Sequence, residues 1–136
     1  MEPRAAIHAL LDRYAALLSA KDLAALGTLH WQDEGFTHTW SSGGIDRGWS
    51  AYARRLEAEF RRMKEPVFRF DDVDAAVFDG RFAAVTAWWR CEFGGEAGAR
   101  VLREGPVTFA VALIGTTWRI VADHYAAKPA GAKESR

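Results

Sequence analysis

The sequence predicts a single α+β domain, with helices in its first half and a meander of antiparallel strands in its second half. Apolar residues recur at helical spacing as far as Met63, the pattern becomes strand-like after Pro66, and no linker or internal repeat divides the chain. The 136 residues, 49% of them hydrophobic, suffice to bury one core without a disulfide or a metal ion. We expect a domain at residues 4–127, followed by a disordered polar tail at 128–136.

Three helices and one short extended segment account for the first half of the chain. The first helix carries an apolar stripe between Ala6 and Leu18, spaced as on one helix face. Asp22 is a good N-cap for a second, short helix, because its side chain can accept from the free amides of the first turn. Residues 35–40 follow as an extended segment and residues 41–48 as a loop, and the third helix runs from about Trp49 to Met63.

Pro66 ends the helical pattern, and four strands are expected after it. These strands cover residues 67–78, 81–93, 99–114 and 118–125, with turns at Asp79–Gly80, 94–98 and 115–117.

The two central strands are apolar or small on both faces, which predicts that both faces of the sheet are covered. The helices cover one face, and a second copy of the chain is the simplest cover for the other. We therefore expect a homodimer through the outer sheet face. If Thr86 and Trp88 line the pocket, the opposite face with Val85 and Trp89 is the interface.

Composition excludes several classes of function. Lys plus Arg and Asp plus Glu both number 18, so no basic surface for nucleic acid is expected. The chain contains no apolar stretch of membrane-spanning length and no signal peptide, which predicts a cytoplasmic protein without a membrane partner. We expect no metal site and no cofactor. The chain has one cysteine, its four histidines lack the spacing of metal ligands, and it has no Gly-rich phosphate loop.

Three short motifs carry a resemblance to a known family. They are Ala20-Lys-Asp-Leu23, Gly48-Trp49 and Trp118-Arg-Ile-Val-Ala-Asp-His-Tyr125. In this order and spacing the chain resembles the SnoaL-like branch of the nuclear transport factor 2-like superfamily, from about residue 7 to residue 126. The resemblance implies a cone-shaped, curved antiparallel sheet wrapped around three N-terminal helices, with a pocket at the open end. The superfamily includes isomerases, cyclases and dehydratases, so fold alone does not give the function.

A more distant resemblance, to ketosteroid isomerase, implies which residues face the substrate. Arg13-Tyr14 precedes the Ala20–Leu23 motif at the separation seen in that enzyme. On this alignment Tyr14 stands at the oxyanion donor, His38 at the general base and Thr108 near the second oxyanion donor. The carboxylate pair of that enzyme is absent, and a phenol and an imidazole remain.

His38 and Tyr14 are accordingly the candidate catalytic residues. An imidazole titrates near neutral pH, so His38 could take a proton beside a carbonyl while Tyr14 donates to the carbonyl oxygen. Strand alternation places His38 on the same face as Phe36 and Trp40. The alternatives are that His38 only binds water at the pocket mouth and that Tyr14 only fills the core.

Five further residues are candidate ligand contacts. Trp40 is close to His38, Trp88 has small neighbours on its strand, and Thr108 leaves room for a ligand. Arg90, expected opposite Glu104, forms either a structural ion pair or an anchor for a carboxylate. Asp123 and His124 point to opposite faces, and His124 is either a pocket residue, as the family motif suggests, or a hydrogen-bonded structural histidine.

Three functions remain open from the sequence. The first is a cofactor-independent acid/base enzyme of isomerase, cyclase or dehydratase type, acting on a small apolar molecule that bears a carbonyl. The second is a module that binds such a molecule without converting it. The third is a dimerisation domain with a vestigial pocket.

Overall fold

The computed structural model describes residues 2–95 and 97–128, so most of the expected tail at 128–136 lies outside the described residues. The helices are α1 (Pro3–Ala20), α2 (Leu23–Gly27) and α3 (Trp49–Arg62). The strands are β1 (Thr37–Thr39), β2 (Ile45–Arg47), β3 (Lys64–Phe78), β4 (Phe82–Gly94), β5 (Arg100–Ile114) and β6 (Thr117–Tyr125). Of the helices described, none is long and apolar enough to cross a membrane.

The helix boundaries follow from local capping. The Glu2 carboxylate accepts from the first free amides of α1, and Pro3 occupies a first-turn position where no N–H is needed. Lys21 ends α1 in the left-handed conformation, and Asp22 then caps α2 by accepting from the Ala25 amide at 3.1 Å.

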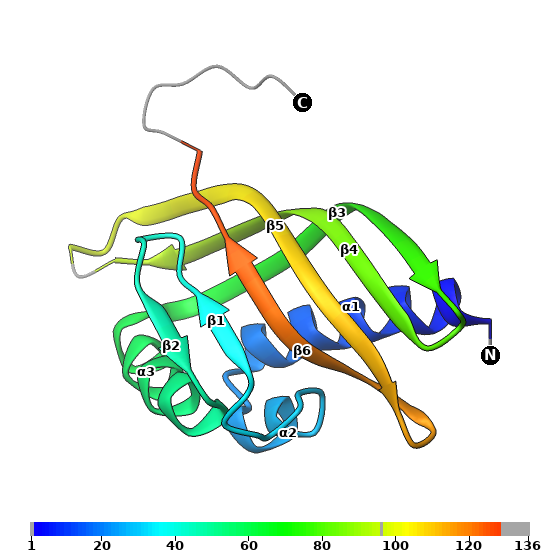
Figure 1. The fold of residues 1–136 in the computed structure, drawn as a ribbon. Coiled ribbons are helices and arrows are strands. Elements are labelled where there is room, and N and C mark those ends of the chain that lie inside the picture. The colour runs from blue at the N-terminus through cyan, green and yellow to red at the C-terminus, as the bar shows by residue number, and fades with distance from the viewer. Residues whose placement is uncertain (1, 96, 129–136) are drawn as a thin grey trace.

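The six strands form one curved sheet in the order β2-β1-β6-β5-β4-β3. The sheet arches over α1, which lies along its concave side, while α3 and α2 lie near the β1–β2 end (Figure 1). Register shifts break the pairing of β3 with β4 between Asp71 and Asp74, and the pairing of β5 with β6 opposite Ala110 and Val111, where β6 carries the extra residue. Such bulges increase local twist and bend, so they help the long strands to wrap the helix.

The α+β class, the helices and the four-stranded meander are as expected, and two details differ. The sheet is mixed rather than wholly antiparallel, because β1 pairs in parallel with β6. A short strand, β2, occupies part of the expected loop at 41–48, since the Ser-Gly turn folds residues 45–47 back onto β1.

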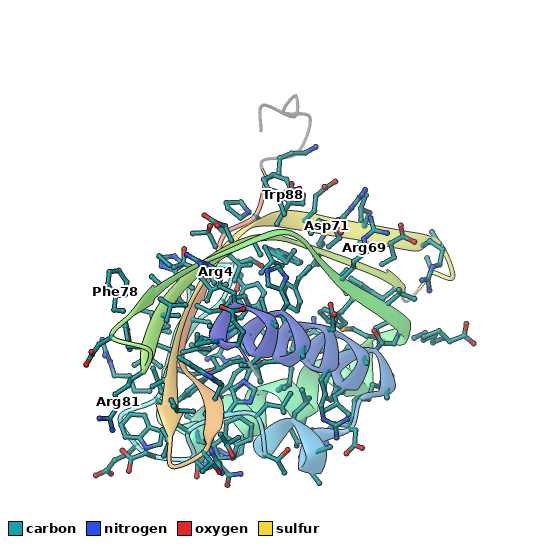
Figure 2. All side chains as sticks on the ribbon, turned by 90° about the vertical axis from the view of Figure 1, so that its right-hand side faces the viewer. Arg4, Arg69, Asp71, Phe78, Arg81 and Trp88 are labelled. Atoms are coloured by element: carbon teal, nitrogen blue, oxygen red, sulfur yellow. The ribbon has the colours of Figure 1, made fainter. Side chains whose placement is uncertain are left out.

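The inner and outer faces of the long strands are the reverse of our expectation. Val85 and Trp89 are 0% and 5% exposed and belong to the core beneath the sheet, so they are not an interface. Thr86 is exposed, and Trp88 lies on the outer side, away from α1 (Figure 2). Alternation could not orient these strands because both faces are apolar. On β5 the larger side chains, Val107, Phe109 and Val111, fill the space between the sheet and the helices, and the register with β4 follows from that.

We predict that Val85→Glu abolishes folding. The substitution would bury an unpaired carboxylate, at a cost of several kcal/mol against a total stability of about 5–15 kcal/mol. Thr86→Glu, on the neighbouring outward residue, should keep the far-UV circular dichroism spectrum and a cooperative thermal transition. Retention of the native spectrum in Val85→Glu would contradict the assignment of the inner face.

Candidate active site

A cavity of about 120 Å³ opens at the end of the molecule where β1, α3 and the starts of β3 and β5 meet. Its inner end is formed by buried polar side chains, Tyr14, His38, Tyr52 and Tyr125. Its walls are mostly apolar and aromatic, and include Trp40, Trp89 and Phe93. More exposed polar residues line its mouth, namely Ser41, Ser42, Glu59 and Arg103. The cavity therefore combines an apolar body with polar groups at both ends, as small-molecule sites do.

His38 and Asp123 form a buried pair beside the inner end of the cavity. The parallel pairing of β1 with β6 aligns the two residues in register. Nδ1 of His38 contacts Oδ1 of Asp123, and the side chains are 4% and 0% exposed. The Asp123 carboxylate makes no other polar contact with the residues described. Because the pair occupies Nδ1, the Nε2 atom is the ring nitrogen left for the cavity that His38 lines.

Three tyrosine hydroxyls meet at the same end. The Tyr125 hydroxyl donates to that of Tyr14 at 3.3 Å, and the Tyr14 and Tyr52 hydroxyls share a hydrogen bond of 3.0 Å. Burial raises the pKa of all three phenols well above the ordinary value, and the Asp123 charge adds to each rise. The cluster is thus neutral, and its two internal bonds leave one hydroxyl proton, on Tyr14 or Tyr52, free to donate to a ligand.

Aromatic contacts fix the orientation of the His38 ring. The ring stacks on Tyr52 with centroids 4.1 Å apart and meets the edge of Trp40 at 4.5 Å. The Trp40 indole N–H in turn donates to the buried Asp46 carboxylate at 2.6 Å, and Arg55 donates to the same carboxylate at 3.2 Å. Trp40 is therefore a fixed wall of the cavity rather than a free side chain.

His30 supports the tyrosines from behind. It is fully buried, its Nδ1 donates to the Leu26 carbonyl at 2.7 Å, and it packs edge-on against Tyr14. Burial lowers the pKa of His30, so the ring is neutral. His30 does not line the cavity, and among the residues described no group of His, Cys, Asp or Glu could hold a metal ion.

Cys91 also lines the cavity, on the wall formed by β4. Burial raises the pKa of its thiol to about 12, although Arg103 and Arg100 act in the opposite direction. The thiol is accordingly protonated at neutral pH and contributes an apolar surface.

The structure brings three of the predicted site residues together and separates the other four from them. Tyr14, His38 and Trp40 line one cavity. The predictions for the other four were wrong in placement: Trp88, Arg90, Thr108 and His124 all lie on the outer face of the sheet.

The outer-face contacts explain the error. Arg90 does face Glu104 across the strands, with Nε 3.6 Å from a carboxylate oxygen, and Trp88 donates to that oxygen at 2.8 Å. The pair is thus an ion pair outside the cavity, not a ligand anchor within it. His124 is exposed, while its neighbour Asp123 points inward, so the family motif contributes its aspartate instead of its histidine to the site.

Sequence reasoning missed Asp123, Tyr52 and Tyr125 as site residues. The alternation of β6 places Asp123 and Tyr125 on one face and could have grouped them. Tyr52 belonged to the apolar stripe of α3, where a core tyrosine and a site tyrosine look alike.

Comparison with known proteins identifies the type of domain. Residues 7–128 match the family model of SnoaL-like domains. No protein with a curated description is significantly similar to the chain in sequence.

Solved structures share the fold at low sequence identity. A nuclear transport factor 2-like superfamily protein from Salmonella enterica superposes with a TM-score of 0.83 at 20% identity, over 96% of this chain and 94% of that one. A Novosphingobium aromaticivorans protein provisionally described as a scytalone dehydratase gives 0.82 at 15% identity, over 96% and 95%. A second protein of that organism, provisionally described as an aromatic ring hydroxylase, gives 0.82 at 19% identity, over 93% and 89%.

We predict that Cys91 is inert to iodoacetamide in the folded protein at pH 8. A thiol whose pKa is about 12 is ionised to only about one part in ten thousand at that pH, and the thiolate is the reactive form. In urea the same thiol should react at the rate of an ordinary cysteine. Mass spectrometry of the alkylated chain measures both rates, and rapid labelling without denaturant would contradict the protonated, buried thiol.

Proposed function

The chain belongs to the SnoaL-like domain family, and we propose that it is a cofactor-independent acid/base enzyme acting on a small, apolar, carbonyl-bearing molecule. The observation that carries the proposal is the His38–Asp123 pair, whose free imidazole nitrogen borders the same cavity as the tyrosine hydroxyls. A base held by a carboxylate, next to a neutral donor, is the arrangement that proton removal beside a carbonyl requires.

The proposed reaction begins with a substrate whose carbonyl oxygen accepts the remaining hydroxyl proton of the Tyr14–Tyr52–Tyr125 cluster. Nε2 of His38 removes a proton from the carbon beside the carbonyl. The electron pair of that C–H bond forms a carbon–carbon double bond, and the π pair of the carbonyl moves to the oxygen, which gives an enolate. Asp123 stabilises the imidazolium that forms, and the tyrosine donor stabilises the enolate. In a substrate with a carbon–carbon double bond conjugated to the enolate, return of the proton to the far carbon of that system gives an isomerase. In a substrate with a hydroxyl on the carbon β to the carbonyl, the enolate expels that hydroxyl as it takes the proton and leaves as water, which gives a dehydratase.

The size and lining of the cavity support a small, flat ligand. Its volume of about 120 Å³ is close to that of engineered cavities, about 150 Å³, that accept benzene. Trp40, Tyr52 and Trp89 present aromatic surfaces, which favour a planar apolar molecule. A ligand longer than one ring would extend toward the open mouth.

The second candidate is a module that binds the same ligand without converting it. The observation that favours it is that the His38–Asp123 pair also fastens β1 to β6, so the pair has a structural use apart from catalysis. Turnover separates the two candidates, because binding alone exchanges no carbon-bound protons. Mass spectrometry of small molecules that copurify with the protein would identify the ligand under either candidate.

We predict that the protein exchanges protons beside the carbonyl of cyclohexenone in deuterated buffer, followed by NMR. His38→Gln should reduce the rate about 10²–10⁴-fold, because it removes the general base. Asp123→Asn and Tyr14→Phe should also slow exchange, since each removes a group that stabilises the charged intermediate.

His124→Gln is the matched control. His124 is next to Asp123 in the sequence but faces outward, so its replacement should leave the rate unchanged. Exchange no faster than in buffer alone, with binding retained, would favour the binding module over the enzyme.

We also infer that the chain forms a homodimer through the outer face of β4, β5 and β6. Small residues leave the middle of this face flat: Ala84, Thr86, Thr108, Ala110 and Ala122 lie there in register across the three strands. No helix among the described residues covers this side (Figure 2), and a second copy would remove it from water.

Light scattering at micromolar concentration should give twice the mass of one chain. Ala110→Arg, in the centre of the face, should give a folded monomer because two guanidinium groups would meet in the interface. Ala24→Arg, on an exposed residue of α2, should remain dimeric. A monomeric wild-type protein would refute this interface.

A further inference from the structure

The mouth of the cavity carries a cationic side chain that the proposed chemistry does not use. Arg103 lies on β5 opposite Cys91, one residue from the outward pair Arg90–Glu104, and therefore points to the inner side of the sheet. It is exposed, whereas the polar residues at the inner end of the cavity are buried. The cavity thus extends from a neutral, buried inner end to a positively charged rim.

Arg103 is held in place by an aromatic ring and not by a carboxylate. Its guanidinium carbon lies 5.5 Å from the centroid of Phe93, which lines the same cavity. Among the residues described, Arg103 forms no ion pair with an acidic side chain. The acid at the rim, Glu59, is 3.5 Å from Arg62 on its own helix. The guanidinium is consequently oriented, and its hydrogen-bond donors remain available.

Two hydroxyl groups complete the rim. Ser41 and Ser42 belong to the turn between β1 and β2 and line the same cavity as Arg103. A hydroxyl and a guanidinium both donate to the oxygens of an anion, and the planar guanidinium does so in a fork that matches a carboxylate. The rim therefore offers the donors of one guanidinium and two hydroxyls to an anionic group.

The geometry points to a substrate that is an apolar monocarboxylic acid, with its carboxylate at Arg103 and its reacting end at His38. To call this molecule a substrate rests on the proposed function, but recognition of its carboxylate does not require turnover. A monoanion is favoured over a phosphate ester because Arg103 supplies one positive charge, while the charge of Glu59 is balanced by Arg62. A dianion would leave one of its two negative charges without a cation at the rim.

Calorimetric titration with 3-phenylpropionate and with its neutral amide, 3-phenylpropanamide, tests the assignment. Both probes carry a ring of the size that the cavity accepts, and they differ only in that a neutral amide of similar size replaces the carboxylate. The wild-type protein should bind the acid about tenfold more tightly than the amide, and the preference should fall as salt is added because Arg103 is exposed.

Arg103→Gln should weaken binding of the acid about tenfold and leave binding of the amide unchanged. Arg61→Gln, which replaces an exposed arginine of α3 outside the cavity, should change neither affinity. Equal affinities for acid and amide in the wild type, no binding of either probe, or a preference that survives Arg103→Gln would each overturn the assignment.

The same titration of His38→Gln separates the assignment from the proposed enzyme. Because His38 is buried in the cavity whereas Arg103 is exposed at its mouth, this variant should keep the preference for the acid. A preference that depends on Arg103, found together with no proton exchange, would refute the enzyme and leave the carboxylate site standing. If His38→Gln lost the preference for the acid, the carboxylate would not be recognised at Arg103 independently of His38, and the assignment would be wrong.

Discussion

The parallel pairing of β1 with β6 is the constraint on which the candidate site depends. This pairing sets His38 beside Asp123, and the antiparallel pairing of β6 with β5 sets Phe109 on the other side of Asp123. The carboxylate is thereby buried between an imidazole and a phenyl ring. A buried carboxylate without a partner is costly, so the fold and the orientation of His38 are mutually dependent. The interaction that fastens the short strand to the sheet also selects which imidazole nitrogen faces the cavity.

The tyrosine cluster joins three elements at the same place. Tyr14 comes from α1, Tyr52 from α3 and Tyr125 from β6, so the two hydrogen bonds between them tie both main helices to the sheet. Away from water, hydrogen bonds of this kind are electrostatically stronger and leave little freedom to their groups. A donor that is already oriented needs no reorganisation when charge develops on a ligand oxygen. The same two hydrogen bonds therefore hold the core together and orient the donor of the site.

Charge along the cavity follows from the alternation of β4 and β5. Cys91 and Arg103 face each other on the inner side, whereas Arg90 and Glu104, one residue further on, face each other outside. Outside, Arg90 and Glu104 form an ion pair with each other, and Glu104 also accepts a hydrogen bond from the Trp88 indole. The inner arginine meets an aromatic ring instead. A slip of β5 by one residue would turn Arg103 outward and Glu104 inward, and would remove the positive charge from the cavity rim.

The sequence by itself determined the α+β class, the three helices, the four long strands and the shared face of His38 and Trp40, because each depends on local periodicity or on a cap. The family motifs added the curved sheet and the place of Tyr14. The inner face of β4 and β5 was not determined, since both faces of those strands are apolar and only packing against α1 distinguishes them. The partnership of His38 with Asp123, 85 residues apart by number, needed the β1–β6 pairing, which no local pattern encodes. Long-range register thus decided which carboxylate and which arginine serve the site.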